Sequence, residues 1–135
     1  ALVAWREAQG EGTDGLIAVC WAIRDRVEHP KWWGDTYTNV IVAPWQLSSM
    51  TAKGDPMLIR WPRRPDPIFE SCLDIADQVI HGTIKNPVPG ADSYYSTTLP
   101  AAPFWAKPEQ FVKQIGHHRF YNTDGSHPDN MTPGG

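Results

Sequence analysis

The sequence predicts an α+β fold in which the helices come first and a small antiparallel sheet comes late. Helical hydrophobic periodicity dominates residues 1–28 and returns at residues 67–81. Patterns typical of strands, rich in aromatic and β-branched residues, begin only at residue 93. Because 135 residues suffice for one domain with a hydrophobic core, we expect the helices and the sheet to share a single core.

A turn rich in glycine separates the first two helices. Residues 1–8 are typical of the end of a helix, and Gly10 and Gly12 follow as stop signals. A second helix is expected over residues 14–28, with Thr13 or Asp14 as its N-terminal cap. Its apolar residues recur at helical spacing and predict one buried stripe: Leu16, Val19, Cys20, Ile23 and Val27.

A third helix is expected over residues 67–81, after a loop-rich segment with one short apolar piece at residues 40–42. Asp66 is the candidate cap, Pro67 suits the first helical position, and Gly82 ends the helix. The predicted buried face consists of Phe69, Cys72, Leu73, Ala76 and Ile80. Since Cys20 and Cys72 both occupy apolar helical positions, we expect two buried free thiols, with a disulfide between the helices as the alternative.

Three strands are expected in the last third of the chain. The stretch "SYYSTTL" at residues 93–99 predicts the first, and "QFVKQIG" and "HHRFY" predict a pair over residues 110–121. The sequence becomes polar and rich in Pro and Gly from Thr123 onward. We therefore expect one domain over residues 1–122 and a loosely ordered tail over residues 123–135.

Composition narrows the classes of function. The net charge of -3 argues against a nucleic-acid binder, and no apolar run approaches the roughly 20 residues that span a membrane. The first residue is Ala, so we expect a trimmed chain whose targeting information is missing. Seven tryptophans exceed the needs of so small a core, and flat apolar side chains in a cleft suit sugars, bases or peptides; core packing is the alternative.

Two glutamates, Glu7 and Glu11, flank the turn after the first helix. Glu7 is expected in the last helical turn, where the negative end of the helix dipole and the neighbouring Trp5 would raise the pKa of a carboxyl group. A raised pKa suits a general acid that works near neutral pH. A solvated glutamate at a helix end is the alternative.

The segment "EAQGEGTDGLIAVCWAIRDRV", residues 7–27, resembles the start of the SleB-type cell-wall hydrolase family, which includes spore-cortex-lytic enzymes and phage endolysins. Further similarities follow in order along the chain and extend the resemblance over residues 3–121. They are carried by "NVIVAPWQLSS", "ADSYYS" and "IGHHRFY" and place Gln46, Ser48, Tyr94, Tyr95, Gly116, His118 and Phe120 at family positions. Departures from the family pattern occur at Gln9, Asp25, Leu47 and Ser96-Thr97.

The resemblance implies a lysozyme-like fold and an enzyme that cleaves peptidoglycan glycan strands between N-acetylmuramic acid and N-acetylglucosamine. It implies Glu7 as the catalytic acid. Gln46, Ser48 and a tyrosine from Tyr94 and Tyr95 would orient the acetamido sugar, with Trp61 at the rim. Such an enzyme needs no cofactor, acts on the bacterial wall as a phage endolysin or a bacterial enzyme, and is expected to be a monomer.

The number of catalytic carboxylates decides between two reactions. If Glu11 is the base that activates water, the products of cleavage carry reducing ends. If Glu11 instead accepts backbone N–H groups near Thr13 and Asp14, it is a supporting residue, and the sugar's own 6-hydroxyl attacks to give anhydro ends. We expect the supporting role.

Two other classes of function stay open. A catalytically silent wall-binding module would use the tryptophans without Glu7. A metal-dependent amidase would need clustered ligands, but His117 and His118 are adjacent in a predicted strand and therefore point to opposite faces. No metal site is expected.

Overall fold

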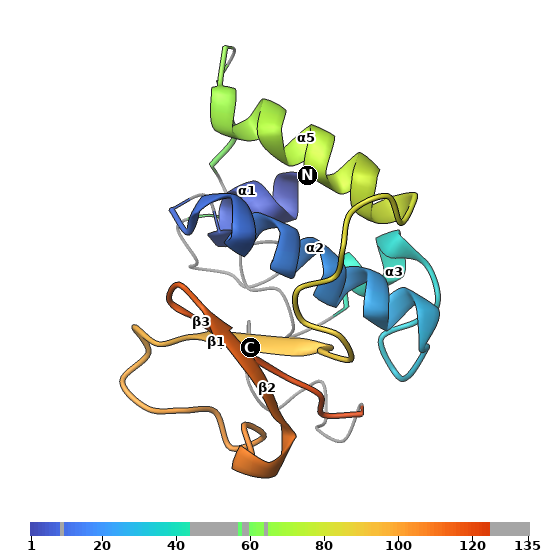
Figure 1. Ribbon diagram of the computed structural model, residues 1–135, viewed down its shortest axis with the longest axis vertical. Helices are drawn as coiled ribbons and strands as arrows, with labels where there is room; N and C mark the ends of the chain where they lie inside the picture. Colours follow the sequence, from blue (N-terminus) through green and yellow to red (C-terminus); the bar gives the residue numbers. More distant parts are fainter. Residues whose placement is uncertain (9, 44–56, 58–59, 64, 125–135) are drawn as a thin grey trace.

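The computed structural model describes residues 1–8, 10–43, 57, 60–63 and 65–124 of the chain. Figure 1 shows the helices in the upper part of the molecule and the strands in the lower part. The α-helices among these described residues are α1 (Leu2–Ala8), α2 (Gly12–Glu28), α3 (Tyr37–Ile41) and α5 (Pro67–Ile80). None of the helices in the described part of the chain is long and apolar enough to cross a membrane.

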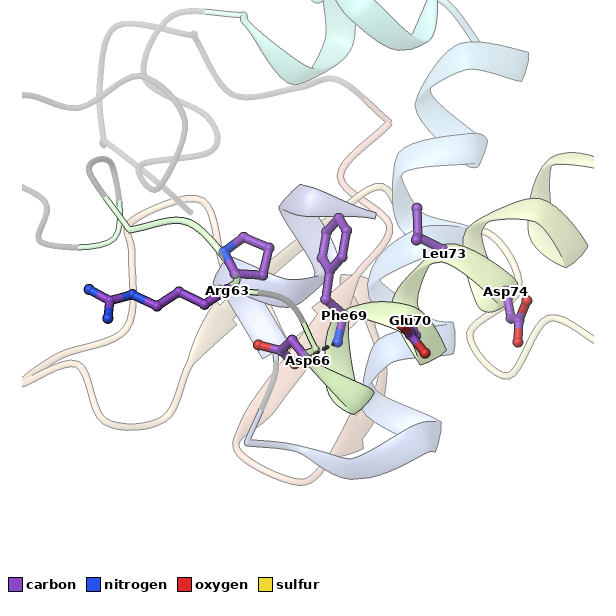
Figure 2. A pocket seen from close by; sticks show the side chains of 7 residues that line it. Arg63, Asp66, Phe69, Glu70, Leu73 and Asp74 are labelled. Carbon is purple, nitrogen blue, oxygen red and sulfur yellow. Dashed lines mark hydrogen bonds between the residues drawn. The ribbon is translucent and has the colours of Figure 1, made fainter.

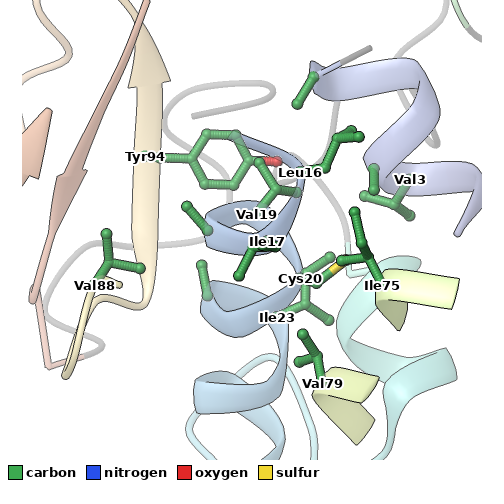
Figure 3. Packing of buried hydrophobic residues seen from close by; sticks show 14 of the residues in the cluster. Val3, Leu16, Ile17, Val19, Cys20, Ile23, Ile75, Val79, Val88 and Tyr94 are labelled. Atoms are coloured by element: carbon green, nitrogen blue, oxygen red, sulfur yellow. The ribbon is translucent and has the colours of Figure 1, made fainter. Parts of the chain in front are cut away.

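Helix α2 is the centre of the helical layer, because α1, α3 and α5 all pack against it. Its apolar residues are buried almost without interruption from Leu16 to Cys20, so the helix contacts neighbours on several sides. Figure 3 shows Ile75 and Val79 of α5 on one side of α2 and Tyr94 of the sheet on the other. One hydrophobic core therefore joins the helices to the sheet.

The sheet contains three antiparallel strands in the order β1-β3-β2. Their bounds are Ser93–Ser96 for β1, Phe111–Ile115 for β2 and His118–Tyr121 for β3, with a short 3-10 helix, η2 (Pro108–Gln110), before β2. Tyr94 pairs with Phe120, and both belong to the main core. Tyr95 and Tyr121 pack instead with Trp105 in a second, smaller cluster.

A buried arginine connects α2 to the start of the sheet. The Arg26 Nε atom donates to the Asp92 carbonyl at 2.5 Å, and its guanidinium lies 4.9 Å from the centre of the Trp33 ring. The Asp92 carboxylate in turn accepts hydrogen bonds from the backbone N–H and the hydroxyl of Thr123. Thr123 is fully buried, so packing extends one residue beyond the predicted domain end; residues 125–135 of the predicted tail lie outside the described residues.

The α+β order and the three long helices and three strands predicted from the sequence are confirmed. Two features of the helices differ from the prediction: the start of α2 and the presence of α3. Helix α2 begins at Gly12 and not at residue 14, and neither Thr13 nor Asp14 caps it, because both lie within its first turn. Helix α3 was missed: its five residues are too few to show periodicity, although Thr36 caps it by accepting from the Asn39 N–H at 3.0 Å.

The buried face of α5 also differs from the prediction. Leu73 and Ile80 are each 49 % exposed, whereas Cys72, Ile75 and Val79 are buried. Helix α5 packs against α1 and α2 along one side of the helix. A narrow apolar stripe is enough to make these contacts, so Leu73 and Ile80, which flank the stripe, stay at the surface.

The start of α5 offers a direct test of the predicted cap. The Asp66 carboxylate accepts a hydrogen bond from the Phe69 N–H at 2.9 Å. Replacing Asp66 by Ala should lower the free energy of unfolding by about 1 kcal/mol, because one N–H at the helix end loses its partner. Urea denaturation measures the change. The Asp66→Asn variant retains an acceptor and should lose clearly less; equal losses in the two variants would contradict a capping role.

Candidate active site

Glu7 lies in the last turn of α1 and meets the sheet through Tyr94. The Tyr94 hydroxyl donates a hydrogen bond of 2.9 Å to Glu7 Oε1. Glu7 is half-buried, whereas Tyr94 is only 5 % exposed and comes from the middle of β1. The fold thus brings together Tyr94 and Glu7, two of the residues singled out from the sequence, although they are 87 positions apart.

Tyr94 is held in its protonated form. Burial raises its pKa well above the usual value, and the adjacent Glu7 charge and the hydrogen bond to Glu7 raise it further. The hydroxyl therefore remains a hydrogen-bond donor at neutral pH and well above it. This hydrogen bond fixes the position of Glu7 Oε1. Because the carboxyl group is rigid, it also sets the direction of the second oxygen, Oε2.

Tyr95 is not part of this arrangement. Its ring stacks on Tyr121 at a centroid distance of 5.8 Å and meets Trp105 edge-on at 6.2 Å. Since neighbouring residues of a strand point to opposite faces, only one of the two tyrosines can face Glu7. Of the two tyrosines, one of which was expected to orient the sugar, only Tyr94 therefore lies beside Glu7, and Tyr95 belongs to the second cluster.

Glu11 attaches the beginning of α2 to the turn between β2 and β3. Its Oε2 atom accepts from the His117 N–H at 2.9 Å, and its Oε1 atom lies 3.2 Å from His117 Nδ1. Only 14 % of the Glu11 side chain is exposed. The carboxylate does accept a backbone N–H, as expected of a supporting residue, but the donor belongs to the sheet and not to residues 13–14.

Two glycines make room for the Glu11 side chain. A Cβ atom on Gly15 would collide with the Glu11 Cβ, and a Cβ atom on Gly116 would collide with Glu11 Oε2. Gly116 also has a φ of 57°, which side chains rarely tolerate. Gly116 therefore allows the turn to approach Glu11, and Gly15 leaves space for the Glu11 side chain within the first turn of α2.

His118 lies on the helix-facing side of β3, next to Tyr94. The two rings meet edge-on with centroids 5.3 Å apart, and His118 is buried. Burial lowers the pKa of His118, although the Glu11 charge opposes this shift, so the ring is neutral near pH 7. His117 is exposed and lies in the turn before β3, not in a strand as predicted, and its ring contacts Glu11.

Trp61 is the exposed aromatic residue of a cluster on the flank of α1. It is 66 % exposed, and the Arg6 guanidinium lies 4.7 Å from its ring centre. Arg6 Nε donates to the Arg60 carbonyl at 3.0 Å, which connects α1 to the segment that carries Trp61. Sequence reasoning expected a Trp or Arg from residues 60–64 at the rim of the site but missed Arg6, since no local pattern indicates this contact.

Two predicted sugar contacts, the two cysteines and the possible metal ligands remain to be placed. Gln46 and Ser48 lie outside the described residues. Cys20 and Cys72 are buried free thiols, as expected, and burial raises the pKa of Cys20 to about 11, which leaves it unreactive. In the portion that the structure describes, no three His, Cys, Asp or Glu side chains come together as metal ligands.

Comparison with known proteins identifies similarities in sequence and in structure. The sequence profile of the family described as Cell Wall Hydrolase matches residues 10–121. The catalytic domain of the germination-specific lytic transglycosylase SleB from Bacillus anthracis is similar in structure, with a TM-score of 0.66 and 23 % identity over 89 % of this chain and 88 % of that one. No curated protein matches the chain. At this identity the structural likeness shows the fold, and the predicted lysozyme-like class is confirmed.

The fit of Glu11 against Gly116 generates a stability prediction. Gly116→Ala should lower the free energy of unfolding by roughly 1–3 kcal/mol, because the new methyl group strains the backbone and displaces the Glu11 carboxylate. Gly10→Ala is the matched control, since nothing lies within 4 Å of a Cβ atom there. Thermal or urea unfolding measures both variants, and equal stabilities would show that α2 does not depend on this contact.

Proposed function

The chain belongs to the cell wall hydrolase family, and we propose that it cleaves the glycan strand of peptidoglycan between N-acetylmuramic acid and N-acetylglucosamine with Glu7 as the general acid. The observation that carries the proposal is the hydrogen bond from the buried Tyr94 hydroxyl to Glu7 Oε1. It fixes a half-buried carboxyl group at a helix end, in a chain whose family acts on cell walls. Glu7 itself lies three residues before the segment matched by the family profile.

In the proposed reaction, Glu7 donates its proton to the glycosidic oxygen as the bond to the muramic acid carbon breaks. The 6-hydroxyl of the same muramic acid then attacks that carbon and returns its proton to Glu7. The sugar ends in an anhydro ring, no water is consumed, and one carboxyl group serves both steps. Tyr94 acts as a positioning residue because it binds the carboxyl group and keeps its own proton.

The contacts of Glu11 support a mechanism with one catalytic carboxylate. Both Glu11 oxygens face His117, one against the backbone N–H and one against the ring. A base that activates water needs a free oxygen directed at the substrate. We therefore assign Glu11 a supporting role and favour transglycosylation over hydrolysis.

The substrate contacts extend beyond the acid. The exposed indole of Trp61 suits stacking against a sugar ring, and Gln46 and Ser48 stay predicted contacts to the acetamido sugar. Such an enzyme would act on the bacterial wall as a monomer, and a phage endolysin is the role that we propose for it.

Replacing the acid tests the assignment directly. Glu7→Gln keeps the size and the hydrogen bond from Tyr94 but removes the proton donor, so the rate of wall lysis should fall by about 10²–10⁴-fold. Loss of turbidity of a cell-wall suspension measures the rate, and circular dichroism checks the fold. Glu109→Gln removes an equal charge at an exposed position and should lyse walls normally. Near-normal lysis by a folded Glu7→Gln protein would contradict the assignment of Glu7 as the general acid.

The supporting role of Glu11 is tested by a second variant and by product mass. Glu11→Gln should retain measurable lysis and show lower stability, because a charged hydrogen bond worth about 1.5–3 kcal/mol is weakened. Mass spectrometry of the wild-type digest should find anhydro ends, which are one water lighter than reducing ends. If Glu11→Gln is as inactive as Glu7→Gln and the products carry reducing ends, Glu11 is the base and the enzyme is a hydrolase.

A further inference from the structure

We propose that the surface between α1 and the start of α5 binds the stem peptide of peptidoglycan, the short peptide attached to the muramic acid. This inference rests on the proposed function and adds a specificity site to it. The surface consists of two adjoining hollows that share Arg63 and Asp66. One hollow is basic and aromatic, and the other is acidic and apolar.

The basic hollow has a volume of about 570 Å³ and is lined by Trp5, Arg60, Trp61, Arg63, Pro65 and Asp66. Arg60 and Arg63 are both exposed, and Trp61 presents its ring beside them. Arg6 supports this wall from behind through its contacts with Trp61 and the Arg60 carbonyl. The arrangement offers guanidinium groups next to an aromatic surface, which suits a carboxylate on a short organic chain.

The described residues leave the two arginines of this hollow, Arg60 and Arg63, without a carboxylate in an ion pair. Asp66 is the one acidic residue of the lining, and its carboxylate caps α5 through the Phe69 N–H. Figure 2 shows the Arg63 side chain extending away from Asp66. The chain as a whole has a net charge of -3, so this hollow stands out as a local excess of positive charge that would attract an anionic ligand.

The second hollow has the opposite character. It has a volume of about 410 Å³, and Glu70 and Asp74 line it from the same side of α5, four residues apart. Phe69 and the 49 % exposed Leu73 supply its apolar surface. An ammonium group on an aliphatic chain fits this lining, because the two carboxylates attract the charge and the apolar side chains cover the methylene groups.

A stem peptide carries groups that suit both hollows: carboxylates for the basic one, and an amine and methyl groups for the acidic, apolar one. It presents carboxylates on its glutamate and at its end, a free amine on its diamino acid, and the methyl groups of its alanines. A phosphate polymer of the wall would satisfy the arginines, but Glu70 and Asp74 would repel it. The pairing of a basic hollow with an acidic one therefore favours the peptide over a polyanion.

The two hollows lie close to the candidate acid along α1 but on another side of the helix. Trp5 lines the basic hollow and precedes Glu7 by two residues, a Cα separation of roughly 5 Å in a helix. Side chains two positions apart leave a helix on nearly opposite sides, so the peptide must pass around α1 to reach the hollows from Glu7. An extended tetrapeptide reaches roughly 13 Å, which exceeds the roughly 10 Å diameter of a helix, so a strand bound at Glu7 can extend its stem peptide to these hollows.

Direct binding tests the inference without any glycan cleavage. The probe is a sugar-free tetrapeptide, N-acetyl-L-Ala-γ-D-Glu-meso-diaminopimelate-D-Ala, in which the diaminopimelate carries the single free amine; it is titrated into the whole chain by calorimetry or NMR. The wild type should bind it, and the double variant R60Q/R63Q should bind it roughly tenfold more weakly. Arg119→Gln, which removes a charge from the far side of the sheet, is the control and should bind as the wild type does. Acetylating the free amine of the peptide should weaken binding to the wild type but not to the double variant E70Q/D74N.

Three results would overturn the inference. They are no binding of the tetrapeptide by the wild type, an equal loss in Arg119→Gln and R60Q/R63Q, and tighter binding of a soluble teichoic acid than of the peptide. The readout separates this inference from the proposed function. Wall lysis without peptide binding refutes the peptide site alone, whereas peptide binding without lysis refutes the proposed enzyme and keeps the site.

Discussion

The position of the candidate acid depends on the buried guanidinium of Arg26. Its Nε atom binds the Asp92 carbonyl, its Nη2 atom lies 3.4 Å from Ser93 Oγ, and its plane rests against Trp33. Burial lowers the pKa of Arg26, and the nearby Asp92 charge opposes the shift; the group stays charged because an arginine begins from so high a value. Strand β1 is thereby anchored to α2 two residues before Tyr94, which then reaches Glu7.

Glu11 provides the second attachment, at the opposite end of α2. Arg26 anchors the beginning of β1, and Glu11 binds the turn that joins β2 to β3. The sheet is therefore attached near both ends of the 17-residue helix α2. Both oxygens of Glu11 are already engaged by His117, which is the basis for the supporting role that we propose for this carboxylate.

The tryptophans show how composition alone can mislead. Their abundance suggested a cleft lined with aromatic side chains, yet Trp5, Trp33 and Trp105 are buried at 2–3 % exposure and pack the two cores. Trp61 behaves differently, because it stands outside both cores and rests on Arg6. Its role is thus distinguished by the arginines around it and not by the number of tryptophans in the chain.

The sequence by itself determined the features that neighbouring residues control. The order of helices and strands, the Asp66 cap and the place of Glu7 at a helix end follow from periodicity and from residues a few positions apart. Only the tertiary structure decided that Tyr94 and not Tyr95 faces Glu7, and that Glu11 binds His117, 106 positions away. It also decided which stripe of α5 is buried. The physical reason is that these outcomes depend on strand register and on which surfaces meet, and such contacts leave no pattern in the residues next to them.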